Sequence, residues 1–442
     1  MKNKINKIIN CLILLYVFLL PWQTVYIFDE KFINGAKSQF LTGQIYGTEI
    51  LLGLIAVIWL AVNFRIHKIS NLTKNFKLSE TKSLFIVSLW LFLAYCGLSV
   101  LWSSDRSAGF YLWLHLLEGA GLMLIILTVN INRLSLLWAL LLSAGVQGLL
   151  ATQQFLTQNI SANKWLGIAG HSAGVLGDIV IETSDGRWLR AYGAFNHPNI
   201  LAGFLVLGLI SGLLLWLDDQ KSRLKLLTIL ISCLIITAGL FFTFSRSAWL
   251  SLIIILPFFI YRGLKKILHQ NQERKRFVTL IFGIILTLAT LAYIFSPLVT
   301  IRANLSNRLE AISTNDRLSQ MVIAGNIISN HWLLGIGLNN YTTKLAQLNP
   351  DALAYDLQPV HNVYLLIFVE LGIVGLGLLI ILFYYAIKSN QKISEKILFM
   401  APLGVILIIS FFDHYFWTQY VSLMLFWLGL TIFLKHDNLD YS

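Results

Sequence analysis

The segment RAYGAFNHPNILAGFLVLGLISGLLLWL, residues 190–217, joins a short polar stretch to a long apolar run. As a helix, that run is long enough to cross a hydrocarbon core of about 30 Å. Of the whole chain, 57% of the residues are hydrophobic and only 12% are charged, and the mean hydropathy is +0.72. So many apolar side chains cannot all be hidden in one water-soluble core. The sequence therefore predicts an integral membrane protein.

Apolar runs of similar length recur along the chain, which predicts an all-α fold with about twelve transmembrane helices in a single polytopic domain, residues 1–442. The first run follows a positively charged start. Because that run is long and no clear small-x-small cleavage site follows it, we expect a retained helix rather than a removed signal peptide. The predicted spans are residues 8–28, 45–63, 84–102, 109–129, 133–156, 199–217, 224–244, 247–264, 277–298, 363–387, 395–412 and 418–434.

The chain is basic, with a formal net charge of +12 at pH 7. In membrane proteins, Lys and Arg chiefly indicate orientation, because cytoplasmic loops are enriched in them. The charge therefore does not predict a nucleic-acid partner. With the N-terminus inside, about two thirds of the 33 Lys and Arg fall on the cytoplasmic side, densely at 65–82 and 262–276. We expect both termini to be cytoplasmic.

Two predicted outer segments are longer and more polar than the other loops: residues 157–198, and a large outer loop, 299–362, between predicted helices 9 and 10. Long loops of mixed composition often carry function. In the second loop, STNDRLSQMVIAGNIISNH, residues 313–331, predicts a short amphipathic helix with Ser313 or Asn315 as its cap. The simplest interpretation is an interfacial helix that shields the bundle.

Several ionisable residues fall at outer helix ends or in these two loops, among them Arg190, Arg246, Arg317 and His361. Ionisable groups at membrane depth are costly, so those present tend to face a cavity or a partner. Guanidinium groups bind phosphate oxygens in a fork, and the near-neutral pKa of histidine, about 6.5, suits a general base. These residues together predict a site for a phosphorylated substrate.

Each of these residues also has a structural interpretation. Arg190 could lie at the membrane interface with its charged end in water. Arg246 could pair with Glu49 or Glu118. His361 could merely cap the helix that follows it.

Three further polar residues are interpreted structurally. In the NHPN turn, Asn196 could cap a helix that begins at Pro198, and His197 is expected to be a structural turn residue. Asp413 and His414 occupy a short turn between two apolar runs. We expect them to be a solvated pair without a role.

The three cysteines, Cys11, Cys96 and Cys233, each fall inside a predicted helix and lie far apart in the sequence. They predict neither a disulfide framework nor a metal site. No nucleotide-binding loop or metal-ligand cluster competes with the histidine–arginine site in the sequence, so no cofactor is expected.

Four stretches carry a family resemblance: GAFNHPNILAGFL (193–205), TFSRSAWL (243–250), HWLLGIGLNNY (331–341) and HNVYLLIFVELGIVG (361–375). The last contains His361, Asn362, nine residues, Gly372, two residues and Gly375. It resembles the histidine motif of the O-antigen ligase and polymerase superfamily of membrane glycosyltransferases. The other three look like further recurring stretches of that family, and the resemblance spans roughly residues 185–420.

The resemblance implies a protein of about twelve helices with a large outer loop in the bacterial cytoplasmic membrane. Such a protein transfers a glycan from an undecaprenyl pyrophosphate carrier to an acceptor hydroxyl, on a glycolipid or glycan, without a metal or nucleotide sugar. The resemblance also implies that His361 is the base and that Arg246 and Arg317 contact the donor pyrophosphate, with Arg190 as a further contact.

Three other functions stay open at this point. Within the family, the chain could be a polymerase of carrier-linked repeat units or a protein O-glycosyltransferase. A lipid-linked sugar transporter is the alternative from another class. A transporter would be expected to have charges along a central path and related halves, whereas the candidate charges here gather on one side.

Overall fold

The computed structural model describes residues 2–66, 80–184, 186–217, 222–267, 271–304, 307–389 and 397–435. Within them the chain is mostly helical, and eight helices are long and apolar enough to cross a membrane. They are α3 (Glu80–Ser99, continued by a short 3-10 turn to Trp102), α4 (Arg106–Thr128), α5 (Arg133–Thr157), α6 (Pro198–Trp216), α7 (Arg223–Phe242), α8 (Arg246–Lys266), α9 (Asn271–Ile294) and α13 (Val363–Lys388). A helical membrane protein is thus confirmed.

Four more helices overlap the remaining predicted spans: α1 (Lys2–Leu19), α2 (Gly47–Ile66), α15 (Ala401–Ile409) and α17 (Tyr420–Leu434). Helix α1 ends at Leu19, so the expected end of the first span at residue 28 is wrong. The apolar parts of α2, α15 and α17 are shorter than a full span. Helices therefore occur at all twelve expected places, while the number of membrane crossings stays a prediction. The free cysteines Cys11, Cys96 and Cys233 lie on α1, α3 and α7.

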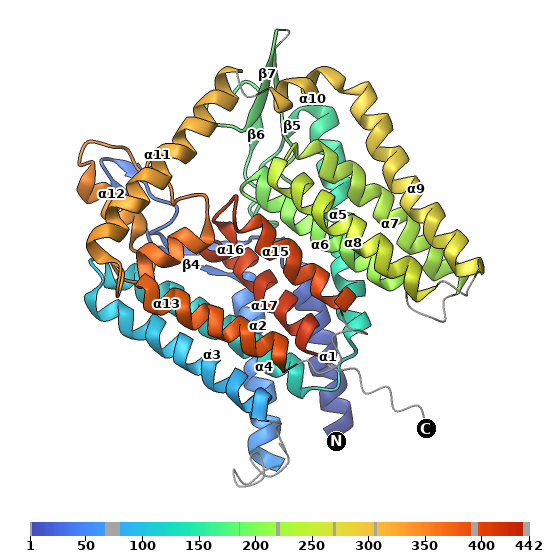
Figure 1. The fold of residues 1–442 in the computed structure, drawn as a ribbon, viewed down its shortest axis with the longest axis horizontal. Helices are drawn as coiled ribbons and strands as arrows, with labels where there is room; N and C mark the ends of the chain where they lie inside the picture. The colour runs from blue at the N-terminus through green and yellow to red at the C-terminus, as the bar shows by residue number, and fades with distance from the viewer. Residues whose placement is uncertain are drawn as a thin grey trace.

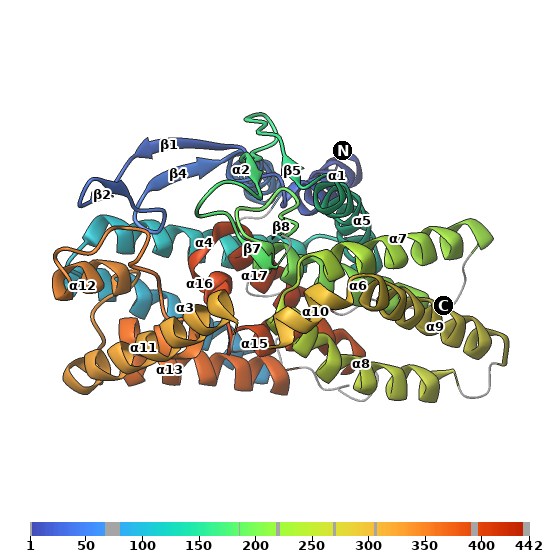
Figure 2. The ribbon, with the colours of Figure 1, turned by 90° about the horizontal axis from the view of Figure 1, so that it is seen from above.

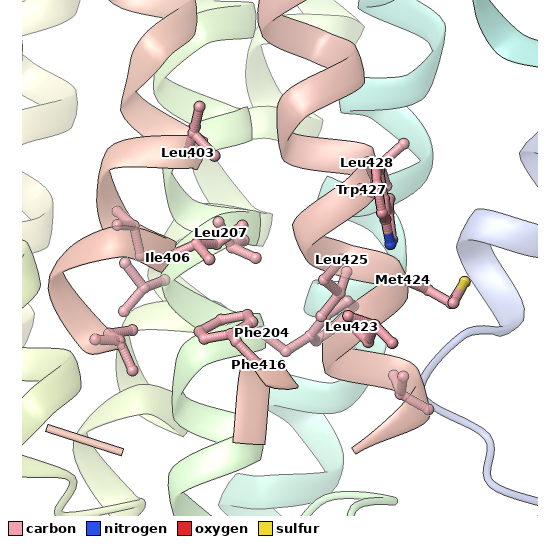
Figure 3. Packing of buried hydrophobic residues seen from close by; sticks show 14 of the residues in the cluster. Phe204, Leu207, Leu403, Ile406, Phe416, Leu423, Met424, Leu425, Trp427 and Leu428 are labelled. Atoms are coloured by element: carbon pink, nitrogen blue, oxygen red, sulfur yellow. The ribbon is translucent and has the colours of Figure 1, made fainter. Parts of the chain in front are cut away.

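Helix α6 forms the centre of the bundle. Every residue of α6 is buried, as expected for a helix that is apolar on all sides. It packs against α5 and α7 on one side and against α15 on the other. In Figure 1, α6 therefore joins α5 and α7 to α15. Figure 3 shows Phe204 and Leu207 of α6 beside Ile406 and Phe416. The start of α6, which carries the polar NHPN turn, is therefore fixed in the middle of the molecule.

The expectation of an all-α fold missed four small antiparallel strand pairs. Between α1 and α2, β1 (Val25–Asp29) pairs with β4 (Gly43–Tyr46), and β2 (Phe32–Ile33) pairs with β3 (Ala36–Lys37). Between α5 and α6, β5 (Asn159–Ile160) pairs with β6 (His171–Ser172), and β7 (Val180–Thr183) pairs with β8 (Gly186–Leu189). In Figure 2, β1 and β4 lie along one flank of the molecule and α11 along the opposite flank.

The predicted large loop, 299–362, is itself largely helical, with α10 (Ser296–Ala303), α11 (Arg308–His331) and α12 (Tyr341–Leu348). Helix α11 begins at Arg308 with Asn307 in the cap position, so the expected start at Ser313 or Asn315 is wrong. The acidic Glu310 lies in the first turn of α11, where a negative charge is favourable. Glu310 also forms ion pairs with Arg246 and Arg302, and we attribute the earlier start of the helix to them.

Two of the sequence motifs, residues 331–341 and 361–375, are structural partners. Gly372 interrupts α13 with φ 66° and ψ −171°. At this kink, Ile336 N donates to Val369 O at 3.0 Å, and Ile373 N donates to Trp332 O at 2.8 Å. A Cβ at Gly372 would collide with the backbone of the 332–337 segment, and the positive φ also favours glycine. This pairing fixes the part of α13 that precedes Gly372, and with it the position of His361, two residues before the helix begins.

Candidate functional site

A cavity of about 300 Å³ opens among the segments that precede α6, α13 and α16 (Tyr415–Thr418), next to α10 and α11. This volume lies at the lower end of the range for ligand pockets, about 300–1,000 Å³. Three of the four predicted site residues, Arg190, Arg317 and His361, line it, whereas Arg246 does not. The other polar side chains in its wall are Gln39, Asp178, Asn196, His197, Asn199, Arg302, Glu310, Ser313, Gln358, Asp413, His414, Tyr415 and Gln419.

His361 lies immediately before α13 but does not cap it. Asn362 is the capping residue, because its Oδ1 accepts from Leu365 N at 2.9 Å. The Nδ1 atom of His361 is 2.9 Å from Gln320 Oε1, on α11. Since a carbonyl oxygen can only accept, Nδ1 carries the proton and Nε2 is left as the free acceptor. The imidazole is thus held in the tautomer that a general base requires.

The electrostatic surroundings keep His361 neutral. Burial lowers the pKa of His361 from its ordinary value of 6.5, and the positive charge of Arg317 lowers it further. The carboxylate of Asp413 acts in the opposite direction without outweighing them. A neutral imidazole is the form that can accept a proton.

Asp413 and His414 are not a solvated pair, and this expectation is wrong. Their exposed fractions are 5% and 6%, and both line the cavity, between α15 and α16 (Tyr415–Thr418). Asp413 Oδ2 accepts from Asn199 Nδ2 at 2.9 Å. The His414 ring packs edge-on against His361, with ring centroids 5.1 Å apart. The high cost of ionisable groups between apolar helices is the signal that could have identified this pair from the sequence.

The charge state of this pair follows from its neighbours. Burial acts to raise the pKa of Asp413, but the nearby imidazoles of His361 and His414 and the guanidinium of Arg317 outweigh it, and the pKa is lowered. Burial lowers the pKa of His414 to about 3, and the proximity of the His361 imidazole acts in the same direction. At neutral pH, Asp413 is therefore an anion and His414 is neutral.

The NHPN turn contributes a capped helix start to the cavity wall. The cap of α6 is His197, whose Nδ1 accepts from Asn199 N at 3.0 Å, so the expected cap at Asn196 is wrong. The expected structural role of His197 is confirmed. His197 also lines the cavity, and burial lowers its pKa to about 3, so it is neutral.

Arg190 is a buried cavity residue rather than an arginine that reaches to the membrane interface. Its exposed fraction is 5%. Its Nε donates to Thr243 O at 2.6 Å, and its Nη2 donates to Asn199 Oδ1 at 2.7 Å. Both partners are neutral groups. The positive charge of Arg190 is therefore not neutralised by these two hydrogen bonds.

Arg246 pairs with a carboxylate that the sequence analysis did not single out. Its Nη1 lies 3.2 Å from Glu310 Oε2, and Arg302 Nη1 contacts the other oxygen of the same carboxylate. Glu49 and Glu118 are not its partners, so that structural interpretation is wrong. Glu310 is buried and lines the cavity. Arg246 therefore contacts a residue of the cavity wall, Glu310, without lining the cavity itself.

Among the arginines in and beside the cavity, Arg317 is the one for which no side-chain hydrogen bond or ion pair within the described residues is found. It lies on α11, lines the cavity and is half-buried. Its Nε is buried, and within the part of the chain that the structure describes this atom has no hydrogen-bond partner. Among those same residues, no carboxylate forms an ion pair with it. A buried guanidinium of this kind favours an anionic ligand.

Among the residues that the structure describes, two groups of side chains have donor atoms close enough to hold a metal ion. In the first, His361, Asp413 and His414, the potential ligand atoms lie within 4.8 Å of one another. The second, on α2 and α4, consists of Glu49, His115 and Glu118, with the same limit. Both histidines of the first group already use Nδ1, His361 toward Gln320 and His414 toward Thr418 at 2.8 Å.

Comparison with known proteins supports one family. No curated protein matches the chain. The family model described as O-antigen ligase matches residues 231–380. This region runs from α7 to α13 and contains Arg246, Arg317 and His361, whereas Arg190 precedes it. Residues 231–380 of this membrane protein are therefore similar to the O-antigen ligase family, which supports the resemblance that the histidine motif predicted.

Proposed function

We propose that this chain is a ligase that transfers a glycan from an undecaprenyl pyrophosphate carrier to an acceptor hydroxyl at the outer face of the bacterial cytoplasmic membrane. One observation carries the proposal above the others. The half-buried His361, with Nδ1 bonded to Gln320, lines the same cavity as Arg317, which forms no ion pair with a carboxylate among the described residues. A neutral base beside a free cation suits attack on a phosphorylated donor.

In this reaction, His361 Nε2 accepts the proton of the acceptor hydroxyl. The oxygen of that hydroxyl forms a bond to the anomeric carbon of the donor sugar. The bond from that carbon to the pyrophosphate oxygen breaks, and its electron pair leaves with the pyrophosphate. A single displacement of this kind inverts the anomeric centre.

The charges around the cavity support both ends of this step. Arg317 and Arg190 would bind the departing pyrophosphate, and Arg246 would add positive potential through the Glu310 pair. The anionic Asp413 has a carboxylate oxygen within 4.8 Å of a His361 nitrogen. It would stabilise the imidazolium that forms when His361 takes the proton. Since arginines can neutralise the leaving group, we propose that no metal is required.

A polymerase, a protein O-glycosyltransferase and a transporter remain the competing functions. Deletion of the gene followed by glycan analysis separates the first of these from a ligase. A ligase predicts that unattached, carrier-linked polymer accumulates. Loss of long chains, with single repeats still attached to the acceptor, would indicate a polymerase instead.

The proposed location can be tested by labelling with an impermeant thiol reagent. The starting variant has Cys11, Cys96 and Cys233 replaced, and carries a single probe, either Ser319→Cys or His436→Cys. Ser319 is exposed on α11, whereas His436 lies outside the described residues. We expect labelling of position 319 in intact cells and of position 436 only after the membrane is broken. The reverse pattern would place the cavity in the cytoplasm and contradict the mechanism.

A further inference from the structure

A second group of titratable side chains lies outside the cavity, on α2 and α4. It consists of Glu49, His115 and Glu118, and we name it the inner cluster. Glu49 lies in the first turn of α2, and His115 and Glu118 lie three residues apart on one face of α4. The potential ligand atoms of the three side chains lie within 4.8 Å of one another. None of these residues lines the cavity that contains His361.

Hydrogen bonds account for two of the three side chains. Glu49 Oε2 accepts from Tyr46 N, and Glu49 Oε1 is 3.0 Å from His115 Nε2. Glu118 is different. Its Oε2 is buried, and within the part of the chain that the structure describes this atom has no hydrogen-bond partner. A buried carboxylate oxygen of this kind is costly unless a further group satisfies it.

Aromatic rings enclose the inner cluster. The rings of Tyr111 and Tyr420 pack against His115. The side chains of His115 and Glu49 are only 6% and 9% exposed. Among the described residues, neither Glu49 nor Glu118 forms an ion pair with a Lys or Arg. Two carboxylates therefore share an apolar enclosure in which histidine is the one partner that can carry a positive charge.

Protons alone do not resolve this arrangement. If His115 is protonated, it balances the charge of Glu49 and leaves that of Glu118. If Glu118 is protonated instead, its Oε2 still has no hydrogen-bond partner among the described residues, and that lack is itself costly. A divalent cation would balance both carboxylates at once and would give Oε2 its missing partner.

We propose that the inner cluster is a structural site for a divalent cation of the zinc class, held by Glu49 Oε1, His115 Nε2 and a carboxylate oxygen of Glu118. Zinc takes imidazole nitrogen and carboxylate oxygen as ligands. The imidazole favours zinc over magnesium and calcium, which prefer oxygen. Binding displaces the proton between His115 Nε2 and Glu49, because only the unprotonated nitrogen can be a ligand. A water or the second oxygen of Glu118 completes a tetrahedral set.

The spacing of the donor atoms suits this ion after a small movement of one side chain. Ligand atoms about 2.0–2.2 Å from a tetrahedral ion lie about 3.3–3.6 Å from one another. The 3.0 Å between Glu49 Oε1 and His115 Nε2 is close to that spacing. Since the ligand atoms all lie within 4.8 Å, Glu118 needs to move by at most about 1.5 Å. Helix α2 packs against α4, so the ion fastens these two helices together and stabilises the fold without touching the cavity.

The test uses the full-length chain in detergent, purified without a polyhistidine tag because such a tag itself binds zinc. The chain is stripped with EDTA, incubated with Zn²⁺, Mn²⁺ or Mg²⁺ alone, and freed of unbound ion by gel filtration. Bound metal is measured by elemental mass spectrometry, and the unfolding temperature is measured with and without the ion. The variants are Glu118→Gln and His115→Gln. The matched control is His414→Gln, a buried histidine of the other group of possible ligands.

We expect about one zinc ion per chain in the unaltered protein and in His414→Gln, and less than about a tenth of that in the two inner-cluster variants, since each removes one of three protein ligands. Zinc should raise the unfolding temperature of the unaltered chain by a few degrees, because an ion that binds only the folded form stabilises it. Without the ion, Glu118→Gln should unfold at the same or a higher temperature than the unaltered chain, because it removes a buried, unpaired charge. A Glu118 that served only as a packing contact would not produce this reversal.

Several results would overturn the site. Absence of bound zinc in the unaltered chain, or equal zinc content in Glu118→Gln, would exclude the inner cluster as a metal site. Zinc lost from His414→Gln but kept by Glu118→Gln would move the ion to the cavity. Preferential retention of magnesium would contradict the zinc class. Glycan transfer, measured in parallel, should not follow the zinc content, so the metal site and the proposed function can fail independently. Transfer that does follow the zinc content would contradict a purely structural ion.

Discussion

The molecule contains two buried clusters with the same kinds of side chain and different surroundings. The outer cluster is His361, Asp413 and His414, and the inner cluster is Glu49, His115 and Glu118. The outer cluster borders the cavity, and Arg317 lies in the same wall. None of the three inner residues lines that cavity.

The inner cluster is enclosed by aromatic rings instead of arginines. Glu49 Oε1 is 3.0 Å from His115 Nε2, and the ring of His115 packs against Tyr111 and Tyr420 at 4.3 and 4.9 Å between centroids. In the part of the chain that the structure describes, Glu118 Oε2 is buried without a hydrogen-bond partner. A histidine next to a carboxylate therefore occurs in both clusters and does not by itself mark the proposed site of glycan transfer. Access and nearby positive charge distinguish the outer cluster.

The largest expected difference between the clusters concerns their histidines. His361→Ala should lower the rate of glycan transfer about 10²- to 10⁴-fold, the usual contribution of a general base. His115→Gln, which keeps a hydrogen-bonding group beside Glu49, should leave the rate within about twofold, because it changes a group remote from the cavity. Transfer measured in membranes at equal protein level checks both. Normal transfer by His361→Ala would exclude this residue from the chemistry.

The arginines should have the next largest effect. Arg317→Ala should lower the rate about 10²- to 10³-fold, because it removes stabilisation of the departing pyrophosphate. Arg246→Ala should lower it less, because Arg246 pairs with Glu310 and does not line the cavity. The matched control is Arg308→Ala on the same helix as Arg317. Its side chain is 68% exposed and pairs with Glu182, and such surface pairs contribute little. Equal effects of Arg308→Ala and Arg317→Ala would show a general loss of charge rather than a specific contact.

Asp413→Asn should have a smaller effect, about tenfold on the rate, because it removes the anion that stabilises the imidazolium. The carboxylate raises the pKa of His361 against the effects of burial and Arg317. Without it, the pKa of His361 falls further. A base is active in its neutral form, so the loss of kcat/KM toward acid should move to lower pH. A pH profile checks this shift, and an acid limb that stays in place or moves upward would contradict it.

The helices were predictable because each is a long apolar run, a signal that does not depend on distant residues. The small strand pairs were missed because strands of two to five residues, such as β2 and β1, carry too short an alternation to detect. The length of α11 was misjudged because the ion pairs of Glu310 join it to Arg302 and Arg246, which no local pattern reports.

The candidate site was predictable only in part, because some of its residues depend on contacts with distant parts of the chain. Arg190, Arg317 and His361 stood out as charged or titratable groups in an apolar chain, and the cavity brings them together. Asp413 was missed because its turn looks exposed locally. Its burial depends on Asn199, 214 residues earlier in the chain.

The smallest expected effect concerns metal removal, which tests whether either cluster uses its donor atoms for an ion. Treatment with EDTA should leave transfer within about twofold, because in our proposal arginines and a neutral histidine supply the chemistry. In the outer cluster, the positive charge of the Arg317 guanidinium opposes the binding of a metal cation. The inner cluster does not line the cavity whose wall contains Arg317. Any metal that the purified chain retains should therefore belong to the inner cluster, and Glu118→Gln should release it without a change in rate. Loss of transfer on chelation that zinc restores in the unaltered chain would instead make the outer cluster a metal centre and replace His361 as the base.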